Sequence, residues 1–333
     1  MHPGALVVYG TKAFPNVALL RLLAGEGFGA DVSTLGELAF ALRAGIDGER
    51  LVFHGNNKSD VELRAAAEAE ALVVLDALEE IDRAAAAGVR SVLIRLTPEI
   101  EAETHHAIRT AHAESKFGLR PGDAVAAVGA ARTAGLDVAR RCADWVPSVF
   151  NIGGGLGVRH TLDEHVPDIA TFSGELVRHV RAHWPEPVRL ILEPGRSLIG
   201  QAGVTLYEIG AVKGTTAAID GGMSDNPRPQ LYQARYEALL ANRADEPTTG
   251  TYRIAGKHCE SGDVLIEAVE LPDPRRGDLL AVPATGGYTL AMASNYNGVP
   301  RPAAVLVGGG DAGLIRRRET VDDLLRLESG LTP

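Results

Sequence analysis

The sequence is poor in cysteine, in aromatic residues and in basic side chains. Its only cysteines, Cys142 and Cys259, are too few for a disulfide framework and too far apart for a metal site. We therefore expect a reducing compartment and no bound metal. Aromatic residues make up 5% of the chain, and 33 basic side chains against 43 acidic ones give a formal charge of −10. That charge argues against nucleic acid and anionic lipid as partners.

Long apolar runs are absent as well. No uninterrupted stretch approaches the roughly 20 residues that a helix needs to cross a bilayer. The first residues, MHPGALVVYGTK, have neither the basic start nor the apolar run of a signal peptide. These absences predict a cytoplasmic protein without a membrane partner.

Short β-branched runs alternate with alanine- and leucine-rich stretches over the first two thirds of the chain. The strand-like runs lie at 5–13, 29–33, 51–55, 71–76, 91–97, 148–154 and 188–194. This alternation predicts parallel strands joined by right-handed helical crossovers. Seven or eight such units indicate an α/β fold with a (β/α)8-type barrel, which we assign to residues 1–203.

The pattern changes after about Gly200. Strand-like runs are now separated by Gly, Pro and Asp turns, with little helix between them. This texture is typical of an antiparallel β domain, which we assign to residues 204–333. The stretch RRETVDDLLRLES near the end predicts a short amphipathic helix.

Three groups in the first domain follow strand-like runs, where barrel enzymes carry their reactive groups. Lys12 follows LVVYG and is either a surface charge or an amine able to form a Schiff base. The glycines of NIGGGLG (151–157) permit close approach of backbone N–H groups to a phosphate, although such turns also serve as plain connections. Glu193 in EPGR suits a protonated pyridine nitrogen, or a local salt bridge.

The second domain offers a possible acid and possible carboxylate ligands. Cys259, in HCESGD, is either a buried small residue or a loop residue able to donate a proton. Arg228 and Tyr232 follow a glycine turn, and their guanidinium and phenol suit a ligand that carries a carboxylate, although both residue types are common on surfaces. Tyr288 lies on a short loop of small residues.

The order of these motifs carries more information than any one of them. YGTKAFPN, GADVSTLGEL, FHGNNKSD, VLIRLTP, SKFGL, NIGGGLG, EPGR, DGGMSDNPRP, HCESGD and SNYNGVPRP occur in that sequence. From Val7 to about Leu325 the chain resembles the diaminopimelate decarboxylases, fold-type III pyridoxal enzymes similar to alanine racemase and ornithine decarboxylase. The resemblance implies a barrel that binds pyridoxal 5′-phosphate, a β domain, and a homodimer with shared active sites.

The resemblance also implies roles for individual residues. Lys12 matches the Schiff-base lysine, and Cys259 matches a proton donor that the partner subunit supplies. The implied cofactor contacts are Gly154, Gly155, Glu193, Gly195, Arg196 and Tyr288, with Glu193 at the pyridine nitrogen. The implied substrate contacts are Arg196, Arg228, Tyr232, Glu260 and Tyr288.

Two parts of the family pattern are missing. The chain starts almost at the lysine strand, without the strand and helix that normally precede it. GLDVA (135–139) then runs directly into residues 140–155, without a βα unit that bears an HIGSQ-like motif. A full repeat of this kind has about 30 residues, and its histidine stacks on the cofactor ring in the family. None of the ten histidines lies in a substitute motif, and we expect a barrel one unit short, with unpaired strand edges.

Three functions stay open on this basis. The resemblance favours decarboxylation of meso-2,6-diaminopimelate to L-lysine and CO2, the last step of lysine biosynthesis. A second interpretation is a pyridoxal-phosphate-dependent decarboxylase for another cationic amino acid, such as ornithine, lysine or a carboxylated diamine. A third is a catalytically impaired paralogue that acts as a binding or interaction protein, because the missing unit would carry a residue that contacts the cofactor.

Overall fold

A computed structural model describes residues 4–97, 116–138, 148–183 and 188–330. The chain divides into two compact units. The first consists of residues 1–155 and 167–195, and the second of residues 156–166 and 196–333. The sequence predicts a single boundary after residue 203. In the structure the second unit starts at Arg196 and also includes the eleven residues 156–166, which interrupt the first unit along the chain.

The first unit is built on one parallel sheet of eight strands, in the order β6-β5-β4-β3-β2-β1-β8-β7. Its neighbouring strands all pair in parallel in the described residues, as the alternation of strands and helices predicted. The strands are β1 (Leu6–Gly10), β2 (Gly29–Val32), β3 (Leu51–Phe53), β4 (Leu72–Leu75), β5 (Ser91–Ile94), β6 (Asp137–Val138), β7 (Val149–Asn151) and β8 (Arg189–Leu192).

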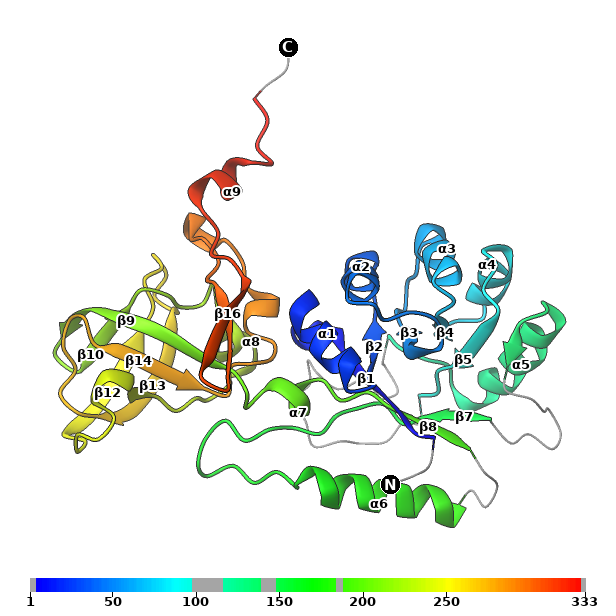
Figure 1. Cartoon of the computed structure of the whole chain (residues 1–333), viewed down its shortest axis with the longest axis horizontal. Helices are drawn as coiled ribbons and strands as arrows, with labels where there is room; N and C mark the ends of the chain where they lie inside the picture. Colours follow the sequence, from blue (N-terminus) through cyan, green and yellow to red (C-terminus); the bar gives the residue numbers. More distant parts are fainter. Residues whose placement is uncertain (1–3, 98–115, 139–147, 184–187, 331–333) are drawn as a thin grey trace. The chain divides into compact units, whose positions relative to one another are not determined.

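Helices connect these strands, and those drawn in blue and cyan in Figure 1 lie side by side along one side of the sheet. They are α1 (Val17–Gly25), α2 (Leu35–Arg43), α3 (Asp60–Glu68), α4 (Glu80–Ala86), α5 (Pro121–Thr133) and α6 (Ile169–His183). Local sequence fixes where several begin. The Asn16 and Thr34 side chains each accept a hydrogen bond from the first turn, and Ser59 forms a reciprocal capping box with Glu62.

The other side of the sheet encloses an apolar cluster. Leu6, Val8, Val52, Val74 and Ile191 come from four different strands and are at most 8% exposed. Each such side chain contributes about 1.5–3 kcal/mol when it leaves water. The cluster therefore holds the strands in the curved arrangement of a barrel wall.

The curved sheet has two ends. In the described part of the chain β6 pairs only with β5, and β7 pairs only with β8. The two strands flank the junction from which the sequence lacks one βα unit. Part of that junction, residues 139–147 with Cys142, lies outside the described residues. The prediction of a (β/α)8-type fold is confirmed by the eight parallel strands, and the expectation that one βα unit is missing stays a prediction.

The second unit contains a mixed sheet of six strands in the order β11-β14-β9-β10-β12-β13. Its strands are β9 (Val204–Lys213), β10 (Thr216–Ile219), β11 (Leu239–Leu240), β12 (Gly250–Ala255), β13 (Val264–Leu271) and β14 (Leu279–Pro283). The prediction of an antiparallel domain holds for four of the five strand pairs of this sheet, and β10 with β12 is a parallel pair.

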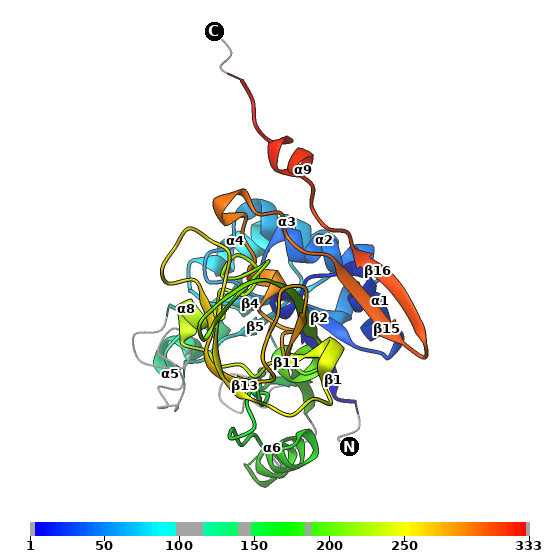
Figure 2. The same ribbon diagram turned by 90° about the vertical axis from the view of Figure 1, so that its left-hand side faces the viewer.

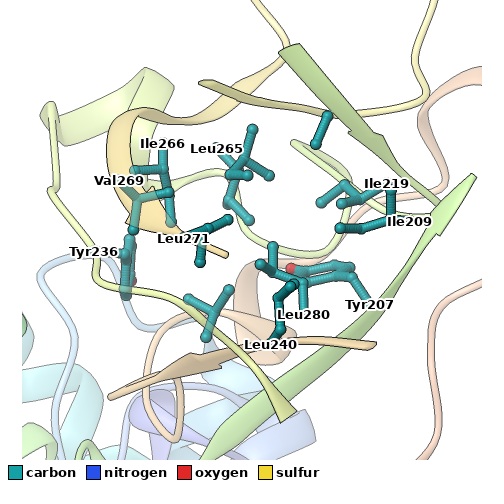
Figure 3. Packing of buried hydrophobic residues seen from close by; sticks show 13 residues of the cluster. Tyr207, Ile209, Ile219, Tyr236, Leu240, Leu265, Ile266, Val269, Leu271 and Leu280 are labelled. Atoms are coloured by element: carbon teal, nitrogen blue, oxygen red, sulfur yellow. The ribbon is translucent and has the colours of Figure 1, made fainter. Parts of the chain in front are cut away.

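A buried cluster joins these strands. Figure 3 shows Tyr207 and Ile209 of β9 facing Leu280 of β14, with Leu265 and Ile266 of β13 on the far side. Two short helices, α7 (Arg196–Ile199) and α8 (Arg228–Tyr232), complete the unit's body. Beyond them lie the separate hairpin of β15 (Ala304–Gly308) and β16 (Asp311–Arg316), orange in Figure 2, and α9 (Val321–Leu325), the predicted terminal helix.

No helix within the described ranges is both long enough and apolar enough to span a membrane.

Candidate active site

Lys12 lies immediately beyond the carboxyl end of β1, in a single turn of 3-10 helix (Thr11–Ala13). The end of β1 is pressed against the EPGR turn that follows β8. Gly10 N donates to Pro194 O at 3.0 Å, and a Cβ on Gly10 would lie 3.4 Å from the Gly195 Cα. The lysine and the EPGR turn are therefore brought to the same rim of the barrel, as the sequence predicted for strand ends.

A chain of polar groups leads from Lys12 to Glu193. Lys12 Nζ lies 3.8 Å from Asp31 Oδ2, at the end of β2. Asp31 Oδ1 lies 3.8 Å from His54 Nε2, and that same nitrogen is 2.7 Å from Glu193 Oε1. Asn151, the last residue of β7, donates from Nδ2 to Glu193 Oε1 at 2.6 Å. Five strands, β1, β2, β3, β7 and β8, thus contribute to one polar cluster.

Burial and charge set the protonation states of this cluster. Burial raises the pKa of Asp31, although His54 and Lys12 oppose it. Burial alone would lower the pKa of His54, but the Asp31 and Glu193 carboxylates outweigh it and raise that pKa above its ordinary value. Burial would raise the pKa of Glu193, yet the hydrogen bonds from His54 and Asn151 lower it. Glu193 is therefore an anion at neutral pH.

Glu193 keeps one oxygen available. The bonds from His54 and Asn151 both end on Oε1, and no residue of the described part of the chain donates to Oε2. A buried, ionised carboxylate with a free oxygen is the group that a protonated pyridine nitrogen requires.

The glycine turn after β7 packs directly on Glu193. Gly153 O accepts from Glu193 N at 2.8 Å, and a Cβ on Gly154 would lie only 2.2 Å from Glu193 O. Gly153 and Gly155 have φ of +70° and +106°, values that side chains disfavour. The turn can exist only with glycine at these positions, and its exposed backbone forms a cradle in which a phosphate fits.

Lys58 provides a useful contrast with Lys12. Its ammonium is buried and donates to Gly55 O at 2.5 Å and Val74 O at 2.7 Å, and it lies 2.9 Å from Glu80 Oε1. Two hydrogen bonds and one ion pair, together with burial, leave this ammonium inaccessible to a ligand. Lys12, by contrast, has a side chain 59% exposed, so its amine is accessible to a cofactor.

The sequence reasoning missed Asp31, His54 and Asn151 as functional residues. The motifs that contain them were recognised, but no role was given to these positions. The positional signal was present, because Asp31 and Asn151 lie in the last two residues of their strands and His54 follows β3 directly. Polar residues at the carboxyl ends of barrel strands are candidates for the active site, and all three residues meet that condition.

The remaining predicted residues lie in the second unit, where two arginines have no ion pair with an acidic residue of the described part of the chain. Arg196 has its Cζ 4.4 Å from the Tyr288 ring centroid, and its Nη1 is buried without a hydrogen bond. Arg228 is 7% exposed and contacts two neutral groups, Tyr236 Oη at 2.5 Å and His160 Nε2 at 3.0 Å, while its Nε has no partner. Buried cations without counter-ions form a site for an anionic ligand.

Other residues of the unit complete this arrangement. Tyr232 ends the one-turn helix α8 that Arg228 begins, so both lie on the same short element. Tyr288 has φ +61°, a left-handed conformation that is rare for a tyrosine and marks a constrained loop.

The HCESGD loop presents Cys259 and Glu260 at the surface. Both are exposed, and Cys259 N donates to Asn297 Oδ1 at 3.0 Å. Asp263 anchors the loop from inside, since it accepts from His258 N at 2.9 Å, from His258 Nδ1 at 2.6 Å and from Met223 N at 2.7 Å. The alternative of Cys259 as a buried core residue is excluded by its exposure.

The structure thus brings Lys12, Gly154, Gly155, Glu193 and Gly195 together in the first unit. Arg196, Arg228, Tyr232, Cys259, Glu260 and Tyr288 belong to the second unit. The roles assigned to these residues, and the prediction that no metal is bound, stay predictions.

Comparison with known proteins agrees with this architecture. Residues 2–140 match the family model described as pyridoxal-dependent decarboxylase, pyridoxal binding domain. A curled parallel sheet with a lysine at its rim and a second β unit define the class of pyridoxal-dependent decarboxylases.

Relatives narrow the class to one family. The chain is 40% identical to the diaminopimelate decarboxylase of Bacillus subtilis, over 97% of this chain and 85% of that protein. It is 40% identical to that of Mycobacterium tuberculosis, over 98% and 86%. The structure of M. jannaschii diaminopimelate decarboxylase in complex with L-lysine superimposes with a TM-score of 0.89 at 30% identity, over 98% of this chain and 85% of that one. The chain belongs to the diaminopimelate decarboxylase family.

The alignment lengths agree with the missing unit. The match to the B. subtilis enzyme runs over 373 positions, but 97% of 333 residues is only about 323. About 50 aligned positions are therefore gaps in this chain. That is enough for the βα unit whose absence the sequence indicated.

Proposed function

We propose that the protein uses pyridoxal 5′-phosphate to decarboxylate meso-2,6-diaminopimelate to L-lysine and CO2. Full-length similarity to diaminopimelate decarboxylases is the observation that carries this proposal. We place the protein in the cytoplasm, as a homodimer in which the partner subunit supplies Cys259. Its low cysteine content and its family support this assignment.

The residues of the first unit fit the cofactor. Lys12 would hold it covalently through its amine, Gly154 and Gly155 would bind its phosphate with Gly195 beside them, and Glu193 would pair with its ring nitrogen. The close packing of Gly154 on the Glu193 backbone, which leaves no room for a Cβ, and the free Oε2 of an ionised Glu193 are the observations behind this fit. Bound there, the pyridoxal ring accepts the electron pair left on Cα when CO2 departs.

Side chains of the protein would hold Glu193 in place, bind the substrate and deliver the proton. His54 and Asn151 keep Glu193 ionised and fixed, so that the ring nitrogen stays protonated. Arg196 and Arg228, with Tyr232, Glu260 and Tyr288, would bind the charged groups of the amino acid. Cys259 would deliver a proton to Cα, replacing the bond to the lost carboxylate, and Lys12 would retake the cofactor.

One observation favours a second candidate. Among the described residues β6 and β7 do not pair, and they border the place where the family carries a histidine against the ring. A protein that binds the cofactor without turnover would follow if that histidine is indispensable. Stacking of this kind contributes about 0.5–1.5 kcal/mol, which covalent attachment through Lys12 outweighs, so we favour an active enzyme.

A substrate panel tests the proposal. The purified protein, saturated with pyridoxal phosphate, is incubated separately with meso-diaminopimelate, L-ornithine and L-lysine, and products are separated by chiral chromatography. We expect L-lysine from the first compound and no diamine from the others. Diamine formation would assign the protein to another cationic substrate, and the absence of CO2 from all three would support the non-catalytic alternative.

A further inference from the structure

His160 lies five residues after the glycine turn, on the segment 156–166 that belongs to the second unit. The segment is tied down at several points. His160 N donates to Glu164 Oε2 at 2.8 Å, and Arg235 Nη2 donates to Asp163 Oδ1 and Oδ2 at 2.6 and 2.8 Å. These bonds hold the backbone on either side of the imidazole, and sequence motifs alone assign no role to this histidine.

The imidazole is directed at Arg228. His160 Nε2 lies 3.0 Å from Arg228 Nη1, and its ring meets Tyr236 edge to face, with centroids 5.5 Å apart at 89°. Arg228 Nη1 also donates to Tyr236 Oη. Two neutral acceptors thus hold one side of the guanidinium, and its buried Nε is left without a partner.

The contact fixes the tautomer of His160. A guanidinium can only donate, so Nε2 must accept with its lone pair. The ring proton then belongs on Nδ1, which lies 3.6 Å from Glu164 Oε2. A second proton, on Nε2, would set N–H against N–H and place two cations side by side. The contact with Arg228 therefore requires a neutral ring.

The surroundings favour the neutral form. Burial lowers the pKa of His160, and the Arg228 and Arg196 guanidiniums lower it further, against the raising effect of Glu164. The phenol ring of Tyr236 packs edge to face on the imidazole.

We propose that His160 is a positioning residue that holds the Arg228 guanidinium in its ligand-binding orientation, and that protonation of His160 releases it. The proposal rests on the proposed function in one respect, namely that Arg228 binds an anionic group of the amino-acid substrate. At acidic pH the affinity for the substrate should then fall, while the rate of the chemical step should not.

The tautomer can be measured without turnover. In protein labelled with ¹⁵N-histidine, long-range ¹H–¹⁵N spectra distinguish Nδ1–H from Nε2–H rings, and the His160→Gln variant assigns the resonance. We expect a neutral Nδ1–H ring at pH 7 that Arg228→Met converts to another state. An Nε2–H or doubly protonated ring at pH 7 would overturn the proposal, whether or not the protein turns over diaminopimelate.

Kinetics then separate positioning from a merely structural role. His160→Gln keeps an acceptor near the Nε2 position but cannot titrate, whereas His160→Ala has neither property. With meso-diaminopimelate at pH 7.5 we expect His160→Ala to raise KM about tenfold with kcat changed less than threefold, since a bond to a charged group is lost. His160→Gln should stay within threefold of wild type. His165→Gln, at an exposed histidine nearby, is the matched control.

The pH profile gives the decisive comparison. Between pH 7.5 and 5.5 the KM of wild type and of His165→Gln should rise together, while that of His160→Gln should rise at least threefold less. Comparing variants cancels every other group that titrates in this range. Equal rises in wild type and His160→Gln, or an unchanged KM in His160→Ala, would refute the positioning role. A wild type that never forms lysine would instead refute the proposed function and leave the spectra to decide on His160.

Discussion

Replacing Gly154 by alanine tests the cradle most sharply. The added Cβ would lie 2.2 Å from Glu193 O and 3.0 Å from Glu193 C, against at least about 3.4 Å in an ordinary contact. Both obstacles are backbone atoms, so no side chain can rotate away. Overpacking of this kind costs about 1–3 kcal/mol, and we expect the upper end, about 3 kcal/mol. The strain falls on the residue assigned to the ring nitrogen.

The assay compares Gly154→Ala with Gly157→Ala, which lies in the same motif, has no neighbouring atom within 4 Å and has no left-handed φ. Thermal unfolding should show a loss of about 6–12 °C for Gly154→Ala. The change should be no more than about 2 °C for Gly157→Ala. Absorbance titration with pyridoxal phosphate should give at least a tenfold weaker Kd for Gly154→Ala alone. Equal behaviour of the two variants would refute the idea that Gly154 is glycine because Glu193 leaves no room.

Three further predictions follow from named contacts. Lys12→Ala should remove the visible absorption of bound cofactor, whereas Lys213→Ala should keep it. Asp263→Ala leaves three donors, Met223 N, His258 N and His258 Nδ1, without an acceptor. It should lower the free energy of unfolding, measured in urea, by about 3–5 kcal/mol, against less than 0.5 kcal/mol for Asp245→Ala at an exposed position. In protein without cofactor, charged His54 between two carboxylates stabilises the fold. Because its pKa is raised above 6.5, its advantage over His54→Gln should be full below that pH and shrink as pH rises through the raised value; an advantage that grows with pH would contradict this.

Much of the fold could be predicted because periodicity is local information. Runs such as LVVYG and LVVL are buried on both faces in a parallel sheet, and the helices between them begin at ordinary caps such as Ser59. The boundary between the units was less accessible. The glycine turn looked like one strand-to-helix connection, and nothing local indicates that residues 156–166 leave the first unit before α6 begins.

The site could be predicted only where a motif carried it. Lys12 and Glu193 stood in recognisable segments, but the links between them depend on distances across the sheet. His54 and Glu193 are 139 residues apart in sequence and 2.7 Å apart in space. His160 and Arg228 likewise meet across 68 residues. Pairings of this kind arise from strand order and packing, which a single sequence does not display.

Covalent attachment of the cofactor to Lys12 is the step on which the proposed activity depends most. Protein mixed with pyridoxal phosphate, reduced with borohydride to make the lysine bond permanent and digested, can be mapped by mass spectrometry. We predict the pyridoxyl group on the peptide that contains Lys12, and on none of the other four lysines, Lys58, Lys116, Lys213 and Lys257. Stoichiometric modification elsewhere, or none at all, would contradict the central claim.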